Sequence, residues 1–223
     1  MKALLYAVVP ALGVLRQVSG VQQARVRSVS SSELRLLYSE LDPNQALPMP
    51  QSAVEFHRVL DTLLQDFDVV PFRFQTWMAI DALTPHVEQN ADAYRTALDA
   101  IAGCIQMEVV ISRAAQSAAA ASAPTGREYL QQKARREQDA RIAAAVVREN
   151  LDPYVQDWQQ QATPEGYRLS ALVPRAELHR FQQHAHKLNA PGALLRLTGP
   201  WPASAFISVQ PQVGVEPQVG DKA

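Results

Sequence analysis

Apolar and polar positions change period several times along the first half of the chain. Residues 4–9 are almost all apolar, which predicts a strand covered on both faces. Residues 24–30 alternate apolar and polar side chains, the period of a half-exposed strand, and residues 34–41 suit either a strand or a helix. Between residues 53 and 67 apolar side chains recur at steps of three and four. This spacing predicts a helix whose apolar stripe packs on a sheet.

The remainder of the first half is interrupted by prolines. Residues 69–74 predict a strand or an extended segment with an embedded proline. From Thr76 to about residue 102 the pattern is helical, with an expected interruption near Pro85.

The second half opens on a strong strand at residues 104–112, which places Ile105 and Met107 on one face and Cys104 and Gln106 on the other. Residues 114–123 are a tract of small residues that suits a helix extension or a linker. A long helix is expected from about Arg127, with a kink at Pro153 and a second helical segment beyond it. A strand at 166–173, a helix at 174–188 and a strand at 193–197 follow.

These elements predict an α+β protein of two subdomains. The expected domains are an N-terminal α/β unit at 1–103 and a C-terminal modified ferredoxin-like sandwich with a long kinked helix at 104–207. One strand of the ferredoxin pattern is missing, so a sheet of three strands or a stub edge is expected. Residues 208–223 repeat Pro-Gln-Val-Gly and predict a disordered tail, with a docking peptide as the minority alternative.

Composition narrows the range of partners. The chain has 223 residues, a formal net charge of −1 and a sequence pI near 6.5, which gives no field for general binding to nucleic acid or to a membrane surface. The single cysteine excludes an internal disulfide and suits a reducing compartment. Because no apolar run approaches the ~20 residues that span a bilayer, we expect a cytoplasmic protein.

Residues with catalytic or metal-binding potential do not form a recognisable pattern. His179, His184 and His186 lack the spacing of a metal site, so surface histidines are expected. Cys104 in a strand, with a distant His57, is expected to be structural packing and not a nucleophile. The few glycines form no phosphate-binding motif. The sequence therefore predicts no enzyme activity, no cofactor and no metal.

Two short blocks combine prolines with aromatic residues. Trp201 lies between Pro200 and Pro202, where the prolines are expected to end the strand and turn the chain. Such a rigid tryptophan either covers the protein's own hydrophobic core or contacts a binding partner. In the other block Arg73 lies between two phenylalanines, where it meets a carboxylate, stacks on a ring or contacts a partner.

Several segments resemble the gas vesicle protein F/L (GvpF/GvpL) family. The matching segments are residues 4–10, 53–60, 69–74, 104–111, 126–130 and, most distinctively, 198–202 with the sequence Thr-Gly-Pro-Trp-Pro. Two departures stand out. Gln75 replaces a glycine that the family tends to carry, and Ala203-Ser204 replaces a proline-tyrosine pair.

The resemblance implies a non-enzymatic accessory or minor structural protein that acts as an assembly factor of gas vesicles. It implies contact with the small shell-forming gas vesicle protein and with other gas vesicle accessory proteins, in the cytoplasm and associated with the vesicle. The candidate partner-binding residues are Trp201, Phe206, Arg73, Phe72 and Phe74. Two alternatives stay open: a ferredoxin-like regulatory module that binds a small ligand between its two halves and, more weakly, a cysteine-dependent enzyme.

Overall fold

The computed structural model describes residues 1–44, 47–113, 126–164, 166–190 and 193–207. The small-residue tract and the tail, for which the sequence suggested a linker and disorder, lie outside these residues. The chain divides into two compact units, Met1–Ala102 with Pro202–Ala223, and Gly103–Trp201. Residues 202–207, expected in the second domain, thus group with the first unit, where Ile207 packs against the core. The domain boundaries expected from the sequence remain a prediction.

The first unit is built on an antiparallel sheet whose inner strand is the most buried part of the chain. Strand β1 (Lys2–Pro10) pairs with β3 (Leu34–Leu41), which pairs with β2 (Val26–Ser31) at one edge. At the other edge β1 pairs with two short strands, β4 (Val70–Pro71) and β5 (Trp77–Met78). Residues 3–9 are all 0% exposed, as the apolar run predicts for a strand covered on both faces.

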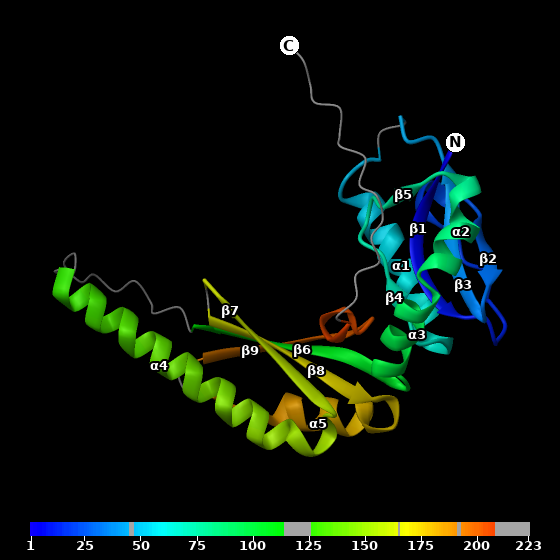
Figure 1. The fold of residues 1–223 in the computed structure, drawn as a ribbon. Helices are drawn as coiled ribbons and strands as arrows, with labels where there is room; N and C mark the ends of the chain where they lie inside the picture. The colour runs from blue at the N-terminus through cyan, green and yellow to red at the C-terminus, as the bar shows by residue number, and fades with distance from the viewer. Residues whose placement is uncertain (45–46, 114–125, 165, 191–192, 208–223) are drawn as a thin grey trace, which may run out of the picture. The chain divides into compact units, whose positions relative to one another are not determined.

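Helices cover both faces of this sheet (Figure 1). Helix α1 (Gln51–Asp66) buries the predicted stripe, and its Phe56 ring lies 5.2 Å from that of Tyr6 in β1. Helices α2 (Leu83–Gln89) and α3 (Ala91–Ala100) supply Leu83, Val87 and Tyr94 to a second cluster with the other face of the sheet. Short 3-10 turns, η1 (Val21–Gln23) and η2 (Ile80–Ala82), connect these elements.

The structure decides between the two alternatives for one segment of this unit and corrects the expectation for another. Residues 34–41, which suited either a strand or a helix, form strand β3. The helical segment expected from Thr76 begins instead as strand β5, and its interruption falls at Asn90 between α2 and α3. Pro85 does not break α2 because it lies in the first turn, where a helix does not need that backbone N–H.

The second unit is a sheet of four antiparallel strands in the order β7-β8-β6-β9. The strands are β6 (Cys104–Arg113), β7 (Asp157–Thr163), β8 (Gly166–Pro174) and β9 (Ala193–Trp201). Helix α4 (Gly126–Leu151) precedes β7, and α5 (Leu178–Lys187) precedes β9. Both helices lie on the same side of the sheet (Figure 1). Short 3-10 turns, η3 (Asp152–Tyr154), η4 (Arg175–Glu177) and η5 (Ser204–Phe206), complete the elements.

The expected kink at Pro153 and the helical segment beyond it are wrong. Helix α4 ends at Leu151, Pro153 lies in the turn η3, and the chain then forms strand β7. This is the strand that the sequence analysis found missing, so the sheet has four strands and not three. Its sequence carries three glutamines and little apolar surface because β7 is an edge strand, largely exposed to water.

Strand β9 also runs further than expected, through Pro200 to Trp201. The register against β6 shifts between Gln106 and Glu108, so an irregularity in the ladder accommodates the glycine and the proline. Gly199 has a φ of +113°, and a Cβ there would lie 3.0 Å from the Gln106 carbonyl oxygen. Glycine is thus required by both the backbone conformation and the close approach of β6.

Candidate partner-binding surfaces

The predicted residues around Arg73 lie on the outer edge of the first sheet, in a stretch we call the edge segment (residues 71–80). Its backbone is tied to β1 by Phe72 N–H donating to Tyr6 O and Leu5 N–H donating to Thr76 O, both at 2.9 Å. Between these two bonds the chain bulges outward. Gln75 has a φ of +66° at the tip, a left-handed conformation that favours glycine.

The two phenylalanines of the edge segment have different surroundings. Phe72 is only 8% exposed and packs near the rings of His86 and Tyr94, so it is a core residue that supports the segment from below. Phe74 is half-buried, with its ring 5.3 Å from that of Phe56 on α1. Arg73 is exposed between them. Phe74 and Arg73 are therefore the two members of this block that a partner can reach.

Trp77 joins this surface, although the sequence analysis did not single it out. It is half-buried in β5 and pairs with Leu4, while Ile80 beyond it is 37% exposed. The sequence analysis expected a helix from Thr76, so it did not place Trp77 in an edge strand. An indole directly after an outward bulge in an edge strand is the signal that identifies it.

Trp201 occupies the end of β9 in the second unit. Its indole is half-buried, its Nε1 lies 3.5 Å from Thr198 Oγ1, and its ladder partner is Gln106. Pro202 and Ala203 are buried, and Phe206 is half-buried in the turn η5 of the first unit. Both predicted aromatic residues thus retain exposed surface, and their role as partner contacts remains a prediction.

A buried polar group lies beneath the edge segment. His86 Nε2 is 2.7 Å from Tyr94 Oη, and the Asn90 side-chain amide donates to His86 O at 2.8 Å while facing His86 Nδ1 at 3.3 Å. Because the amide nitrogen can only donate, Nδ1 accepts and Nε2 carries the proton. Burial lowers the pKa of His86 and raises the pKa of Tyr94, so both groups stay neutral around pH 7.

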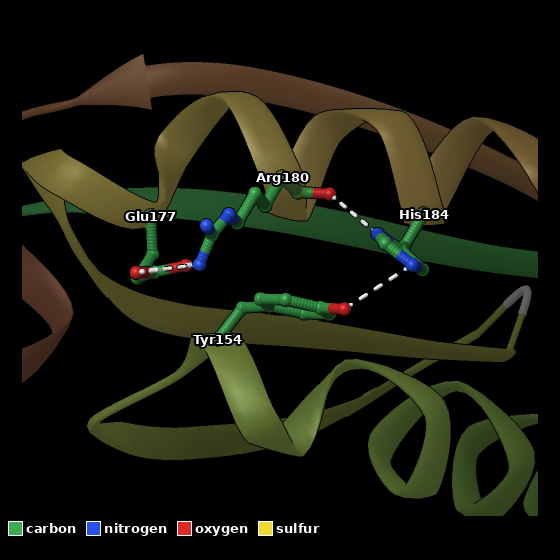
Figure 2. Close-up of polar contacts among 4 residues, drawn as sticks. All are labelled: Tyr154, Glu177, Arg180 and His184. Atoms are coloured by element: carbon green, nitrogen blue, oxygen red, sulfur yellow. Dashed lines mark hydrogen bonds and ion pairs between the residues drawn. The ribbon is translucent and has the colours of Figure 1, made fainter.

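His184 of α5 lies in a separate surface cluster of the second unit, together with Tyr154, Glu177 and Arg180 (Figure 2). Tyr154 Oη lies 3.1 Å from His184 Nε2, and His184 Nδ1 lies 2.9 Å from the Arg180 carbonyl oxygen. Because that carbonyl can only accept, Nδ1 carries the proton and the tyrosine hydroxyl donates to Nε2. An ion pair of 3.5 Å joins Arg180 to Glu177. These contacts hold η3 against α5 and account for His184 structurally.

Among the residues that the structure describes, no group of three or more histidine, cysteine or acidic side chains is placed to hold a metal ion. Cys104 is 4% exposed, and its thiol lies 3.1 Å from Gln156 Oε1. No helix within the described ranges is both long and apolar enough to cross a membrane.

The fold and these surfaces define a two-unit α+β protein whose candidate sites are aromatic surfaces for protein contact. The model of the gas vesicle synthesis protein GvpL/GvpF family matches residues 3–208, and the chain belongs to this family. No curated protein matches the sequence significantly.

Two solved structures of the gas vesicle protein GvpF have a similar fold. The crystal structure of GvpF from Anabaena sp. PCC7120 is 16% identical with a TM-score of 0.78, over 94% of this chain and 97% of that one. GvpF from Microcystis aeruginosa is also 16% identical, with a TM-score of 0.74 over 93% of this chain and 99% of that one. At this identity the likeness establishes the fold alone.

Proposed function

We propose that this chain is a non-enzymatic accessory or minor structural protein of gas vesicle assembly that binds the small shell-forming protein in the cytoplasm. Family membership supports a role in gas vesicle synthesis. A shell that encloses gas presents apolar surface inward. Before assembly, that surface needs a partner that covers it, because exposed apolar patches associate non-specifically in water.

The edge segment is the observation that carries this proposal. It places two half-buried aromatic rings, Phe74 and Trp77, beside an exposed arginine on the outer edge of a sheet. Aromatic residues and arginine are the side chains most enriched at interface hot spots. The segment is held by bonds to β1 on both sides of the bulge, so little conformational entropy is lost when a partner binds.

Trp201 in the second unit and Phe206 in the first are two further candidate contacts, each considered by itself. Gly199, Pro200 and Pro202 restrict the backbone around the indole, which favours binding in the same way. The family's proline-tyrosine pair is replaced by Ala203-Ser204, and Ala203 is only 1% exposed. The chain therefore lacks an aromatic side chain at position 204.

We also propose that the second unit is a ferredoxin-like sandwich. The element order β-α-β-β-α-β and the strand order β7-β8-β6-β9 support this assignment. Strand β7, at the edge of the sheet, is the strand of this fold that the sequence pattern lacked.

Capture of the shell protein by variants of the full chain tests the edge segment. We expect Trp77→Ala to weaken capture by roughly 2 kcal/mol, a factor of about 30, while the melting temperature changes little. Trp158→Ala is the matched control, since Trp158 is also a half-buried tryptophan in an edge strand but lies in the other unit.

Two outcomes of this experiment distinguish an error in the proposed site from an error in the proposed partner. Equal capture by Trp77→Ala and wild type would remove the edge segment from the interface. If wild-type protein failed to capture the shell protein at all, the proposed partner would be wrong.

A further inference from the structure

In the part of the second unit that the structure describes, both helices lie on one face of the sheet and none lies on the other (Figure 1). On the helix-covered face, Met107 and Ile111 of β6 are at most 1% exposed, and their register partners on β8 and β9 point the same way. Because successive side chains of a strand point to opposite faces, the alternate positions lie on the other face. Figure 1 shows α4 and α5 on one side of the sheet only. Near Trp201 the face opposite the helices is buried at Gln106 and Leu172.

Towards the other end of the strands, Arg168 and Arg196 on this face are exposed and flank a valine. Val110 of β6 pairs directly with Arg168 of β8 on one side and with Arg196 of β9 on the other. Since neighbouring strands lie about 4.8 Å apart, the two arginines leave the sheet roughly 10 Å from one another. Leu194, 57% exposed, lies diagonally beside Val110 on the same face. Val110 and Leu194 thus form an apolar centre between Arg168 and Arg196. We call this surface the arginine face.

The charges of the arginine face are only partly balanced. Glu108 Oε2 lies 3.9 Å from Arg168 Nε. Glu108 is two residues before Val110 in β6 and pairs with Ser170 of β8. Arg196 is exposed, and within the described ranges it has neither an ion pair nor a side-chain hydrogen bond. Guanidinium groups bind carboxylates in a planar, two-pronged geometry, and arginine is enriched at protein interfaces.

We infer that the arginine face docks a carboxylate-bearing segment of another gas vesicle protein. The partner's carboxylates meet Arg196 and Arg168, and its apolar side chains cover Val110 and Leu194. A polyanion such as nucleic acid or anionic lipid fits less well, because Glu108 lies on the same face and the chain has a net charge of −1. The inference rests on family membership and is independent of the edge segment and its proposed contact with the shell protein.

Zero-length crosslinking in cells that co-express the gas vesicle genes identifies the occupant. Arg196→Lys keeps the positive charge and introduces an amine, which a carbodiimide couples only to a carboxylate in direct contact. We expect a crosslink from position 196 to an aspartate or glutamate of a gas vesicle protein. Arg180→Lys, on helix α5 across the sheet, is the matched control and is expected to give no such product.

Co-purification with the full-length chain provides the second measurement. The double variant Arg168→Gln with Arg196→Gln should lose at least tenfold of the crosslinked partner, with an unchanged melting temperature, while Arg180→Gln retains it. The inference is overturned by unchanged co-purification, by absence of a crosslink at position 196, or by a crosslink to a second copy or to this chain's own carboxylates. Loss of shell-protein capture in Trp77→Ala is a separate result and bears on the proposed function alone.

Discussion

At the scale of single residues, a chain of buried hydrogen bonds holds the turn that precedes β2. Val21 N–H donates to Tyr6 Oη at 2.9 Å, the tyrosine hydroxyl donates to Ser39 Oγ at 3.1 Å, and Ser39 Oγ donates to Arg25 O. Burial raises the pKa of Tyr6, so its hydroxyl stays protonated and remains a donor. Removing one link would leave a buried polar group without a partner.

Gly20 lies against this chain and provides the first test of it. A Cβ at Gly20 would lie 2.3 Å from Tyr6 Oη and 2.5 Å from Ser39 Oγ. We expect Gly20→Ala to lower the free energy of unfolding by about 3 kcal/mol. Gly103→Ala is the control, because Gly103 has a φ of +65° but no heavy atom within 4 Å of the added Cβ, so only backbone strain of about 1 kcal/mol is expected. Chemical denaturation measures both, and equal losses would contradict the clash.

His86 predicts a dependence of stability on pH. Burial lowers the pKa of His86 in the folded state. On acidification the unfolded chain, whose histidine pKa is about 6.5, therefore binds a proton first. The stability from this group is fully present above about pH 6.5. It is lost as the pH falls from there through the lower folded pKa. Urea unfolding at a series of pH values should show this loss, and His86→Gln should flatten the slope in that window. An unchanged slope in the variant would exclude His86 as its cause.

At the scale of secondary-structure elements, alternation along β6 determines what its side chains do. Ile105, Met107, Val109 and Ile111 are all buried on the face that the helices cover. Cys104 begins the strand on the other set of positions, and its thiol contacts Gln156 after the turn η3. This contact closes the end of the strand and gives the cysteine a packing role.

Cys104→Ala tests that role. Loss of a buried sulfur should lower the free energy of unfolding by about 1 kcal/mol and leave vesicle formation intact. Vesicle formation is scored by light scattering of cells that carry the variant in place of the wild-type gene. If a variant of normal stability made no vesicles, the thiol would have a chemical role and the hypothesis of a cysteine-dependent enzyme would return.

At the scale of the whole molecule, Trp201 is the last residue of the second unit, and the chain continues directly into the part that groups with the first. Its backbone is restricted by neighbouring prolines, and its indole is half-buried. An indole in this position either stabilises the fold or is a rigid contact for a partner. The two roles predict different results for the same substitution.

Trp201→Ala distinguishes these roles in two measurements. An interface anchor should cost roughly 2 kcal/mol in capture of the shell protein with thermal stability unchanged. If the indole covers the core, the substitution should instead lower the free energy of unfolding by about 3 kcal/mol. Trp158→Ala again serves as the matched tryptophan control. If neither binding nor stability changed, the most family-like block of the sequence would be irrelevant to the proposed function.

Local sequence patterns determined the elements that have strong periodicity and a covered face. The apolar run of β1, the stripe of α1 and the alternation of β6 each depend on neighbouring residues in the chain, so they were predictable, as was the α+β class. The Thr-Gly-Pro-Trp-Pro block is likewise a local feature, and it is the most distinctive of the segments that together resemble the gas vesicle family.

Tertiary structure decided what local patterns do not encode. Strand β7 has a polar sequence, and only its pairing with β8 makes it a strand. Phe72 and Phe74 are separated by one residue, yet one is in the core and the other reaches the surface because the edge segment bulges between its bonds to β1. Arg168 and Arg196 become neighbours of Val110 through strand register. Pairing between distant strands sets each of these positions, and a strand's partner is absent from its own sequence.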